Sequence, residues 1–213
     1  HLRKAEESPD ADRLTVQLTR VEFLLDDGQA EQARPILESL HTLNPRHPGV
    51  LLWLARCYRQ MGAWEPLRQL LPELQKQKVF GPELFAEIQN ETYHALLQGA
   101  AASGSLEKLR ALWKQIPATL REGNEALLVD YATALCEFDA FDDAEALLRE
   151  AINRRWSSKL VVGYGMLERG NAAAQLATAE GWLTRHGDDP YLLLTLGRRA
   201  KRCQQPAKAR NYL

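Results

Sequence analysis

Residues 28–45 read GQAEQARPILESLHTLNP, and residues 62–74 read GAWEPLRQLLPEL. In both stretches a glycine precedes three apolar residues with the same spacing, and the second set follows the first by 34 residues: Ala33, Leu37 and Leu40, then Leu67, Leu71 and Leu74. Steps of four and three place such side chains on one face of a helix. A helix that recurs with a period of about 34 residues is typical of stacked helical hairpins.

The same spacing returns further along the chain, in Ala144, Leu148 and Ala151, and it begins again at Ala209 and Leu213. A helical hairpin of this period is the signature of the tetratricopeptide repeat. We therefore predict an all-α fold, a tetratricopeptide-like right-handed helical solenoid of about six helix hairpins. Because 111 residues separate Ala33 from Ala144, which is more than three periods, we expect extra length in the middle of the chain.

The predicted organisation is a frayed N-terminal segment over residues 1–10 and a single solenoid over residues 11–213. The hairpins are expected at about 11–44, 48–79, 82–117, 124–155, 157–189 and 191–213, the last one truncated. Asn124 and Asn171 are expected to cap helices. Each repeat of a solenoid contacts only its neighbours, so the chain is expected to present an extended binding surface.

Composition narrows the function without defining it. The net charge of the 213 residues is -1, so no overall field favours nucleic acid or an anionic membrane. No apolar run approaches the roughly 18 residues that a membrane-spanning helix needs, and no signal peptide is visible. The three cysteines form no CxxC pair, and an odd number argues against a complete disulfide framework, which favours a reducing compartment.

Charge is unevenly distributed along the second half of the chain. Six acidic residues and one base lie between Glu137 and Glu150, whereas residues 191–213 hold six basic residues and no acid. Two interpretations stay open: each run is the solvated face of a helix, or together they form a bipolar surface that meets a charged partner.

No catalytic motif stands out. The glycines of residues 163–170 (GYGMLERG) have the wrong final spacing for a dinucleotide-binding fingerprint, and no strand precedes them. No nucleophile–base pair and no set of metal ligands is recognisable. We therefore expect a protein that is not an enzyme, with no catalytic residue and no metal site.

Tetratricopeptide arrays generally bind along a concave groove lined by the first helix of each hairpin. This register assigns eight residues of the second, fourth and last repeats to the groove: Arg56, Arg59 and Gln60, then Thr133 and Glu137, then Arg198, Lys201 and Arg202. Arginines on a concave face suit the carboxylates of an extended acidic peptide, and the propionates of a porphyrin would satisfy the same rule.

Part of the sequence is more specific than a generic repeat. Asn44 to Pro48, Gly62 to Trp64 and Leu71-Pro72 together resemble the C-terminal repeat region of the proteobacterial HemY family, and Asp189 to Leu193 also fits. The resemblance covers most of the chain and is sharp over residues 43–75. It implies an inner-membrane protein with two N-terminal membrane helices, which this sequence lacks, and a repeat region facing the cytoplasm. It also implies an association with a late step of protohaem synthesis.

With this resemblance, the leading functional hypothesis is a non-catalytic scaffold that docks haem-biosynthesis enzymes at the inner membrane. Its partners would be proteins, not nucleic acids, and membrane contact would come only through the absent N-terminal helices. The alternative is a carrier or sensor of haem or porphyrin. No other cofactor is expected. In that alternative His47 and His94 are the candidate haem ligands, because histidine is a common axial ligand of haem iron.

Overall fold

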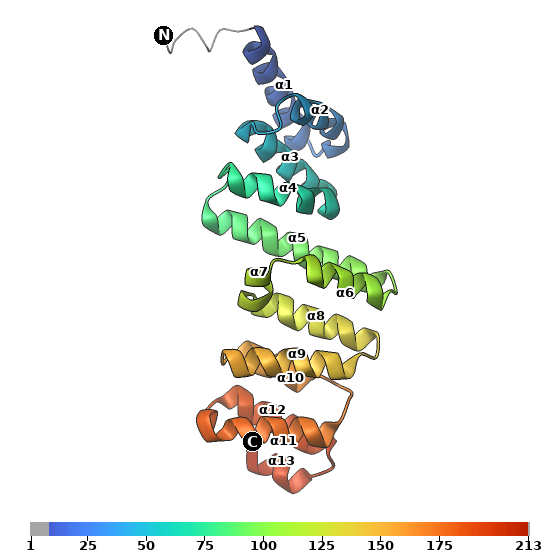
Figure 1. Cartoon of the computed structure of the whole chain (residues 1–213), viewed down its shortest axis with the longest axis vertical. Helices are drawn as coiled ribbons and strands as arrows, with labels where there is room; N and C mark the ends of the chain where they lie inside the picture. Colours follow the sequence, from blue (N-terminus) through green and yellow to red (C-terminus); the bar gives the residue numbers. More distant parts are fainter. Residues whose placement is uncertain (1–8, 213) are drawn as a thin grey trace. The chain divides into compact units, whose positions relative to one another are not determined.

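The computed structural model describes residues 9–212, and all regular secondary structure in this part of the chain is α-helical, which confirms the predicted fold class (Figure 1). Residues 1–8, most of the predicted frayed segment, and Leu213 lie outside the described residues. The thirteen helices of the described part are α1 (Pro9–Asp26), α2 (Ala30–Leu43), α3 (Pro48–Met61), α4 (Trp64–Lys76), α5 (Pro82–Ala102), α6 (Leu106–Gln115), α7 (Ala118–Gly123), α8 (Glu125–Glu137), α9 (Phe141–Arg154), α10 (Ser158–Met166), α11 (Ala172–His186), α12 (Pro190–Arg202) and α13 (Pro206–Tyr212).

The helix ends follow from local chemistry. Gly62 ends α3 with a positive φ of 64°, a conformation that glycine adopts without a steric penalty. Asn124 caps α8, because its side-chain oxygen accepts hydrogen bonds from the backbone N–H groups of Ala126 and Leu127. Asn171 caps α11 in the same way, through the N–H of Ala174 at 3.0 Å. Both predicted caps are therefore confirmed.

By their contacts the helices group into two compact units that meet in the sequence within α5: unit 1 ends at Leu96, and unit 2 begins at Leu97. In unit 1, α2 packs against α1 and α3, and α3 packs against α1 and α4. The residues that carry the period form the core of this unit: Ala33, Leu37, Leu67 and Leu74 are completely buried. The 34-residue spacing thus records the burial of equivalent positions in successive hairpins.

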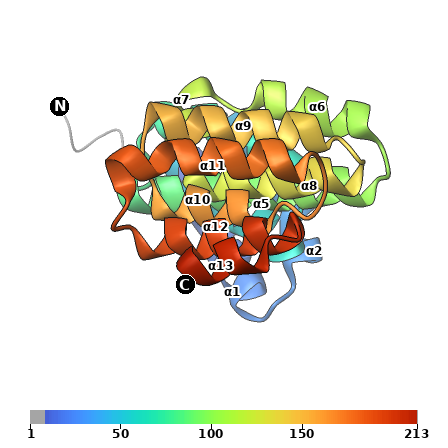
Figure 2. The ribbon, with the colours of Figure 1, turned by 90° about the horizontal axis from the view of Figure 1, so that it is seen from below.

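In unit 2, α8, α10 and α12 pack side by side, with α10 in the middle, and α9 and α11 cover them (Figure 2). The short helix α7 packs against α8 and lies between the two hairpins expected at 82–117 and 124–155. It accounts for part of the extra length predicted in the middle of the chain. The division into a single solenoid over residues 11–213 stays a prediction.

None of the helices in the described part of the chain combines the length and the apolar character that crossing a membrane requires.

Candidate functional site

A groove in unit 2, which we call the unit 2 groove, has a volume of about 620 Å³ and lies along α8 and α10. Its apolar lining includes Val129, Ala132, Met166 and Leu167. Met166 is 59% exposed, so its side chain presents apolar surface to the groove. The charged lining is mostly acidic and consists of Glu137, Asp139, Glu168 and Arg169.

Two of the eight predicted binding residues, Thr133 and Glu137, line this groove. Both are exposed on α8, one turn apart. The Thr133 hydroxyl donates a hydrogen bond to the carbonyl of Val129 at 2.9 Å, so its methyl group and lone pairs remain available to the groove. Among the residues that the structure describes, Glu137 makes no ion pair. Its carboxylate can therefore accept a donor from a ligand.

Two glycines of α10 allow its neighbours to approach closely. A Cβ atom on Gly163 would meet a methyl group of Val129 in α8 at 2.9 Å, and one on Gly165 would meet Oγ1 of Thr195 in α12 at 2.6 Å. Both distances are too short for real side-chain contacts. The glycines that suggested a defective nucleotide motif in the sequence thus set the spacing of the three helices that carry the site.

A buried cation ties α12 to the end of α10. The Arg199 side chain is completely buried, and its guanidinium donates hydrogen bonds to the carbonyls of Tyr164 and Leu167 and to Oε1 of Gln175. Burial and the nearby charge of Arg202 lower the pKa of Arg199 to about 10, so it stays charged at neutral pH. A cation is favourable at a helix C-terminus, because the carbonyl groups there carry partial negative charge.

The predicted basic residues of the last repeat lie beside this anchor. Arg202 also donates a hydrogen bond to the carbonyl of Leu167, which lines the groove. Arg198 precedes it by one turn on the same face of α12 and is exposed, as is Lys201. Within the described residues neither Arg198 nor Lys201 forms an ion pair, so both charges are open to solvent and to a ligand.

The predicted residues of the second repeat are engaged within unit 1. Arg56 pairs with Asp26 at 2.7 Å and lies over the ring of Trp53, and Arg59 pairs with Glu91 at 2.6 Å. The amide of Gln60 donates a hydrogen bond to the carbonyl of Leu25 at 3.1 Å. These side chains link α3 to α1 and α5. An acidic ligand would have to displace the internal carboxylates before it could use them.

The two candidate haem ligands lie in unit 1. His47 caps α3, since its Nδ1 accepts a hydrogen bond from the N–H of Val50 at 3.3 Å, and only its other ring nitrogen is left for a metal. His94 is exposed on α5. Their role as ligands stays a prediction. It requires a saturable shift of the Soret band in a haem titration, and that shift must be lost in His47→Ala or His94→Ala.

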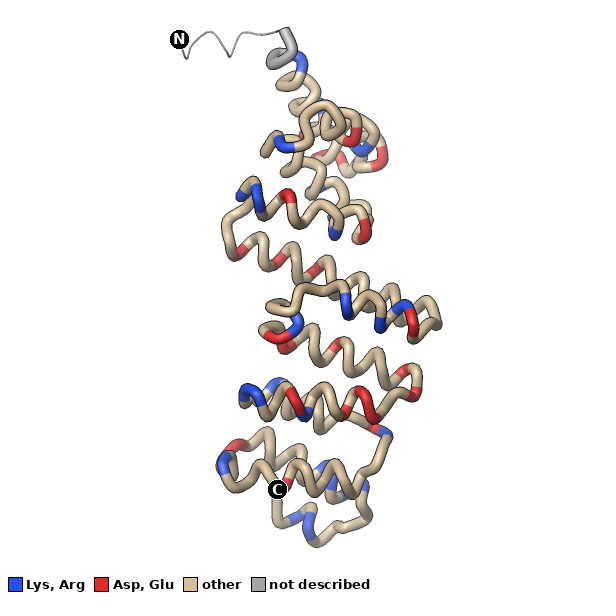
Figure 3. The backbone as a smooth tube through the Cα atoms, in the orientation of Figure 1, with Lys and Arg blue, Asp and Glu red and all other residues tan. Residues whose placement is uncertain are grey.

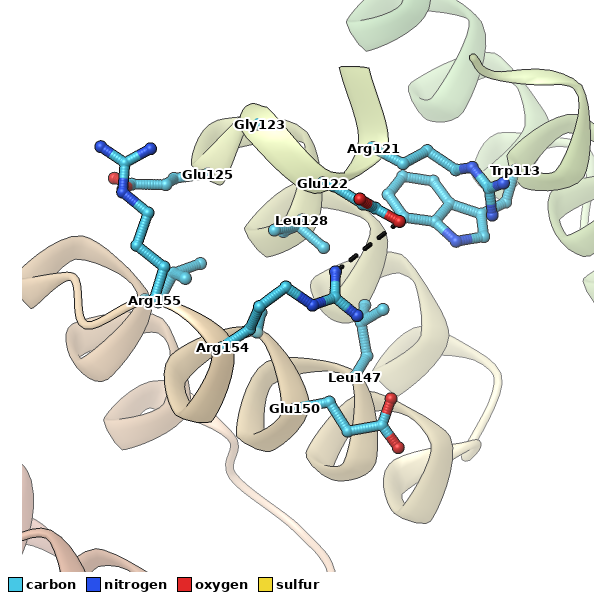
Figure 4. Close-up of a pocket in the computed structure, with 12 residues that line it drawn as sticks. Trp113, Arg121, Glu122, Gly123, Glu125, Leu128, Leu147, Glu150, Arg154 and Arg155 are labelled. Carbon is cyan, nitrogen blue, oxygen red and sulfur yellow. Dashed lines mark ion pairs between the residues drawn. The ribbon is translucent and has the colours of Figure 1, made fainter. Parts of the chain in front are cut away.

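A second cavity of unit 2 is much smaller, about 150 Å³, and its walls come from α6 to α10. Figure 4 shows Arg154 of α9 pointing toward Glu122 of α7, with which it forms an ion pair at 3.8 Å. The lining holds three arginines and three glutamates, so their charges cancel: Arg121, Arg154, Arg155, Glu122, Glu125 and Glu150. Ligand pockets usually measure about 300–1,000 Å³. This cavity is therefore a poor candidate beside the unit 2 groove.

Two of the three thiols, those of Cys57 and Cys136, have the character of structural cysteines. Burial raises the pKa of the Cys57 thiol to about 11, and burial also raises the pKa of Cys136, which lines the unit 2 groove. A protonated thiol is a weak nucleophile and a weak metal ligand. No group of three or more histidine, cysteine or acidic side chains in the described part of the chain is arranged to hold a metal ion.

Paired helices at a 34-residue spacing, with a groove along the first helices of the pairs, are the arrangement typical of tetratricopeptide repeats. In agreement, residues 24–85 match the sequence family described as the tetratricopeptide repeat. The particular resemblance is to HemY. Protein HemY of Escherichia coli strain K12 is 29% identical over 197 residues, which are 92% of this chain and 49% of HemY. Protein HemY of Shigella flexneri gives the same values. The resemblance read from the sequence is thus confirmed.

The chain spans about half the length of these curated relatives. Among solved structures, a thermophilic tetratricopeptide-repeat protein of Thermus thermophilus is 21% identical with a TM-score of 0.37, over 89% of this chain and 98% of that chain.

Proposed function

We propose that this chain is a non-catalytic docking module whose protein partner binds in the unit 2 groove. The observation that carries the proposal is Met166, which is 59% exposed in a groove whose rim holds unpaired charges. Exposed apolar surface rimmed by polar groups is typical of interaction sites, because partner binding removes that surface from water, and Met166 contributes it here beside the apolar lining of the groove. Tetratricopeptide repeats typically act through such contacts rather than through chemistry.

The proposal extends to the biological setting through the similarity to HemY. We propose that the partners are proteins of haem biosynthesis and that docking takes place at the inner membrane. The support for this part is the homology itself, over 92% of the chain. No residue of the groove selects haem enzymes on chemical grounds alone, so the identity of the partner is a matter for direct capture.

The test is a crosslinking pull-down with the full-length protein from its native membrane, repeated with Met166→Glu. A charge on the groove floor should abolish capture of the partner, because a buried unpaired carboxylate is strongly unfavourable. The matched control is Phe23→Glu on α1, where the side chain is 68% exposed and outside the groove. Equal capture by the wild type and both variants would refute the role of the groove.

The proposal that the partners are proteins of haem biosynthesis has a separate test. Late haem-pathway enzymes should appear among the captured proteins, and each should bind the purified full-length protein in calorimetry. Capture of other proteins alone, with the Met166 dependence intact, would keep the docking module and reject the haem setting.

A further inference from the structure

Of the four charged residues that line the unit 2 groove, Asp139 and Arg169 form an ion pair at 3.1 Å, whereas Glu137 and Glu168 form none within the described residues. Unpaired charges of the opposite sign lie on the neighbouring helix α12. On the side of α8 and the end of α10, Glu137 and Glu168 are exposed and form no ion pair within the described residues. On the neighbouring helix α12, which contacts the groove lining at Leu167, Arg198 and Lys201 are also exposed and form no ion pair within the described residues. Figure 3 shows the acidic segments at the connection between α8 and α9 and the basic ones along α12 and α13.

This arrangement differs from that of unit 1, where Arg56 and Arg59, which the sequence assigned to the groove, already have carboxylate partners. Side chains that are paired internally gain little from a ligand. Unpaired exposed charges gain the full, if modest, energy of a new ion pair. The unpaired set in unit 2 is therefore the one that can select a partner by charge.

One exposed apolar side chain lies between the two sets of charges: Met166, which is 59% exposed at the end of α10, the helix between α8 and α12. Tyr191, 50% exposed, and Leu194 continue the apolar surface along the face of α12 that also carries Arg198. Residues 191, 194 and 198 are three and four positions apart, so they follow one face of the helix. A segment that crosses from α8 to α12 would pass over this apolar strip.

The distance between α8 and α12 determines how far apart the two charged residues of a ligand must be. Packed helices lie about 8–10 Å apart, so α8 and α12, with α10 between them, are separated by about 16–20 Å. An extended chain advances about 3.3 Å per residue, so five or six residues span this distance.

We propose that the unit 2 groove, together with the adjoining exposed face of α12, binds an extended segment of a partner protein with a basic residue, a central apolar residue and an acidic residue, the two charges five or six positions apart. The basic residue meets Glu137 and Glu168, the apolar residue covers Met166, and the acidic residue meets Arg198 and Lys201. The inference rests on the proposed docking function and names its partner chemistry. A wholly acidic segment fits less well, because the carboxylates on the α8 side would repel it.

The test uses four fluorescein-labelled peptides with the pattern X-Gly-Ser-Leu-Ser-Gly-X and the purified chain, followed by fluorescence polarisation. The end residues are Arg and Glu in the bipolar peptide, and two Glu, two Arg or two Gln in the others. The bipolar peptide should bind about two- to fivefold more tightly than each of the others at low salt, as expected for exposed ion pairs. Salt should reduce the preference, because it screens surface charges.

Two charge reversals sharpen the test by removing the preference. Glu137→Lys leaves Glu168 beside a new cation, so the α8 side becomes neutral and the two-Glu peptide should bind as tightly as the bipolar one. Arg198→Glu leaves Lys201 beside a new carboxylate, so the α12 side becomes neutral and the two-Arg peptide should bind as tightly as the bipolar one. The matched controls Glu150→Lys on α9 and Arg210→Glu on α13 change the same charges at exposed sites outside the groove, and should leave the ranking unchanged.

A ranking that ignores Glu137 and Arg198, or that favours the two-Glu peptide with the wild-type chain, would overturn the bipolar ligand. The proposed function fails separately: it falls only when Met166→Glu leaves capture of the native partner intact. Loss of capture in Met166→Glu without any peptide preference would therefore reject this inference and keep the docking role.

Discussion

Arg199 is a fully buried cation whose hydrogen-bond partners are neutral oxygens, and one of its donors, Nε–H, has no partner. Replacing it by alanine would leave Oε1 of Gln175 without its donor, would remove one of the hydrogen bonds that the carbonyls of Tyr164 and Leu167 accept, and would leave a cavity. We expect Arg199→Ala to lower the free energy of unfolding by about 3 kcal/mol in urea titrations. The neighbouring control Arg198→Ala, at an exposed site, should change it by less than about 0.5 kcal/mol. Similar losses in the two variants would show that the capping role is wrong.

The sequence indicated which basic residues of α12 are candidates for binding, but it did not indicate the buried position of Arg199. The repeat register assigned Arg198 and Lys201 to a binding groove; both are exposed on α12, and their role in binding stays a prediction. The register did not reveal that Arg199 is buried, because arginine is rarely found inside a protein. A signal was present: position 199 continues the apolar series Leu192 and Leu196 at a step of three. An arginine in the buried phase of a helix indicates a cation that has found carbonyl partners.

Among single helices, α10 depends most on the absence of side chains. Gly165→Ala would place a methyl group against the buried Thr195, whose hydroxyl is held by the carbonyl of Val161 at 3.1 Å. We expect a destabilisation of about 1–3 kcal/mol, typical of overpacking. Gly181→Ala is the matched control, since nothing lies within 4 Å of the added carbon in α11. It should stabilise the protein by about 0.5–1 kcal/mol, because alanine favours the helix.

Thermal unfolding of Gly165→Ala and Gly181→Ala measures both expected changes in stability. A stabilised Gly165→Ala would mean that α10 and α12 can separate without cost, and the close approach would then not define the groove.

The start of α12 depends on Asp189, which caps the helix and joins it to the segment before α10. Its carboxylate accepts hydrogen bonds from the indole of Trp156 at 2.9 Å, from the Ser158 hydroxyl, and from the backbone N–H groups of Tyr191 and Leu192. Burial alone would raise the pKa of Asp189, but these hydrogen bonds hold it below its usual value. The folded state therefore favours the ionised form.

This shift has a definite sign in the pH dependence of stability. A carboxyl group with a lowered pKa in the folded state stabilises the protein above its unfolded pKa of about 4, and this contribution is lost as pH falls through the folded pKa. We expect Asp189→Asn to be less stable than the wild type at pH 7, by about 1 kcal/mol. The difference should shrink as urea titrations move below about pH 4. A gap that is constant with pH would contradict the role of the charge.

The boundaries of most helices were predictable because glycine, proline and asparagine mark them, as at Gly62, Pro48 and Asn124. The helix α7 was not, since its six residues carry no buried side chain and hence no apolar period. The ion pairs of Arg56 and Arg59 could not be predicted either, because their partners Asp26 and Glu91 lie 30 and 32 residues away in the sequence. A single sequence predicts which residues share one face of a helix, but it does not predict which residues of another helix they contact.

At the scale of the whole molecule, contacts in repeat proteins join elements that are near in sequence, so a local defect is expected to remain local. Arg199→Ala should therefore accelerate amide hydrogen exchange in α10 and α12 of unit 2 and leave the protected amides of α2 and α3 in unit 1 unchanged. Hydrogen exchange followed by mass spectrometry measures this directly. Uniform acceleration throughout the chain would instead indicate one cooperative folding unit.

Because Arg198 is exposed and Arg199 is buried, covalent labelling of these two adjacent arginines can report local opening of the structure. An arginine-selective dicarbonyl reagent should modify the exposed Arg198 in the native protein, while the guanidinium of Arg199 reacts only when α12 detaches from the end of α10. Two adjacent residues would then give, in a single peptide fragment, one rate for reagent access and one for local opening. The ratio of the two rates measures how often α12 separates from the end of α10 in the native protein.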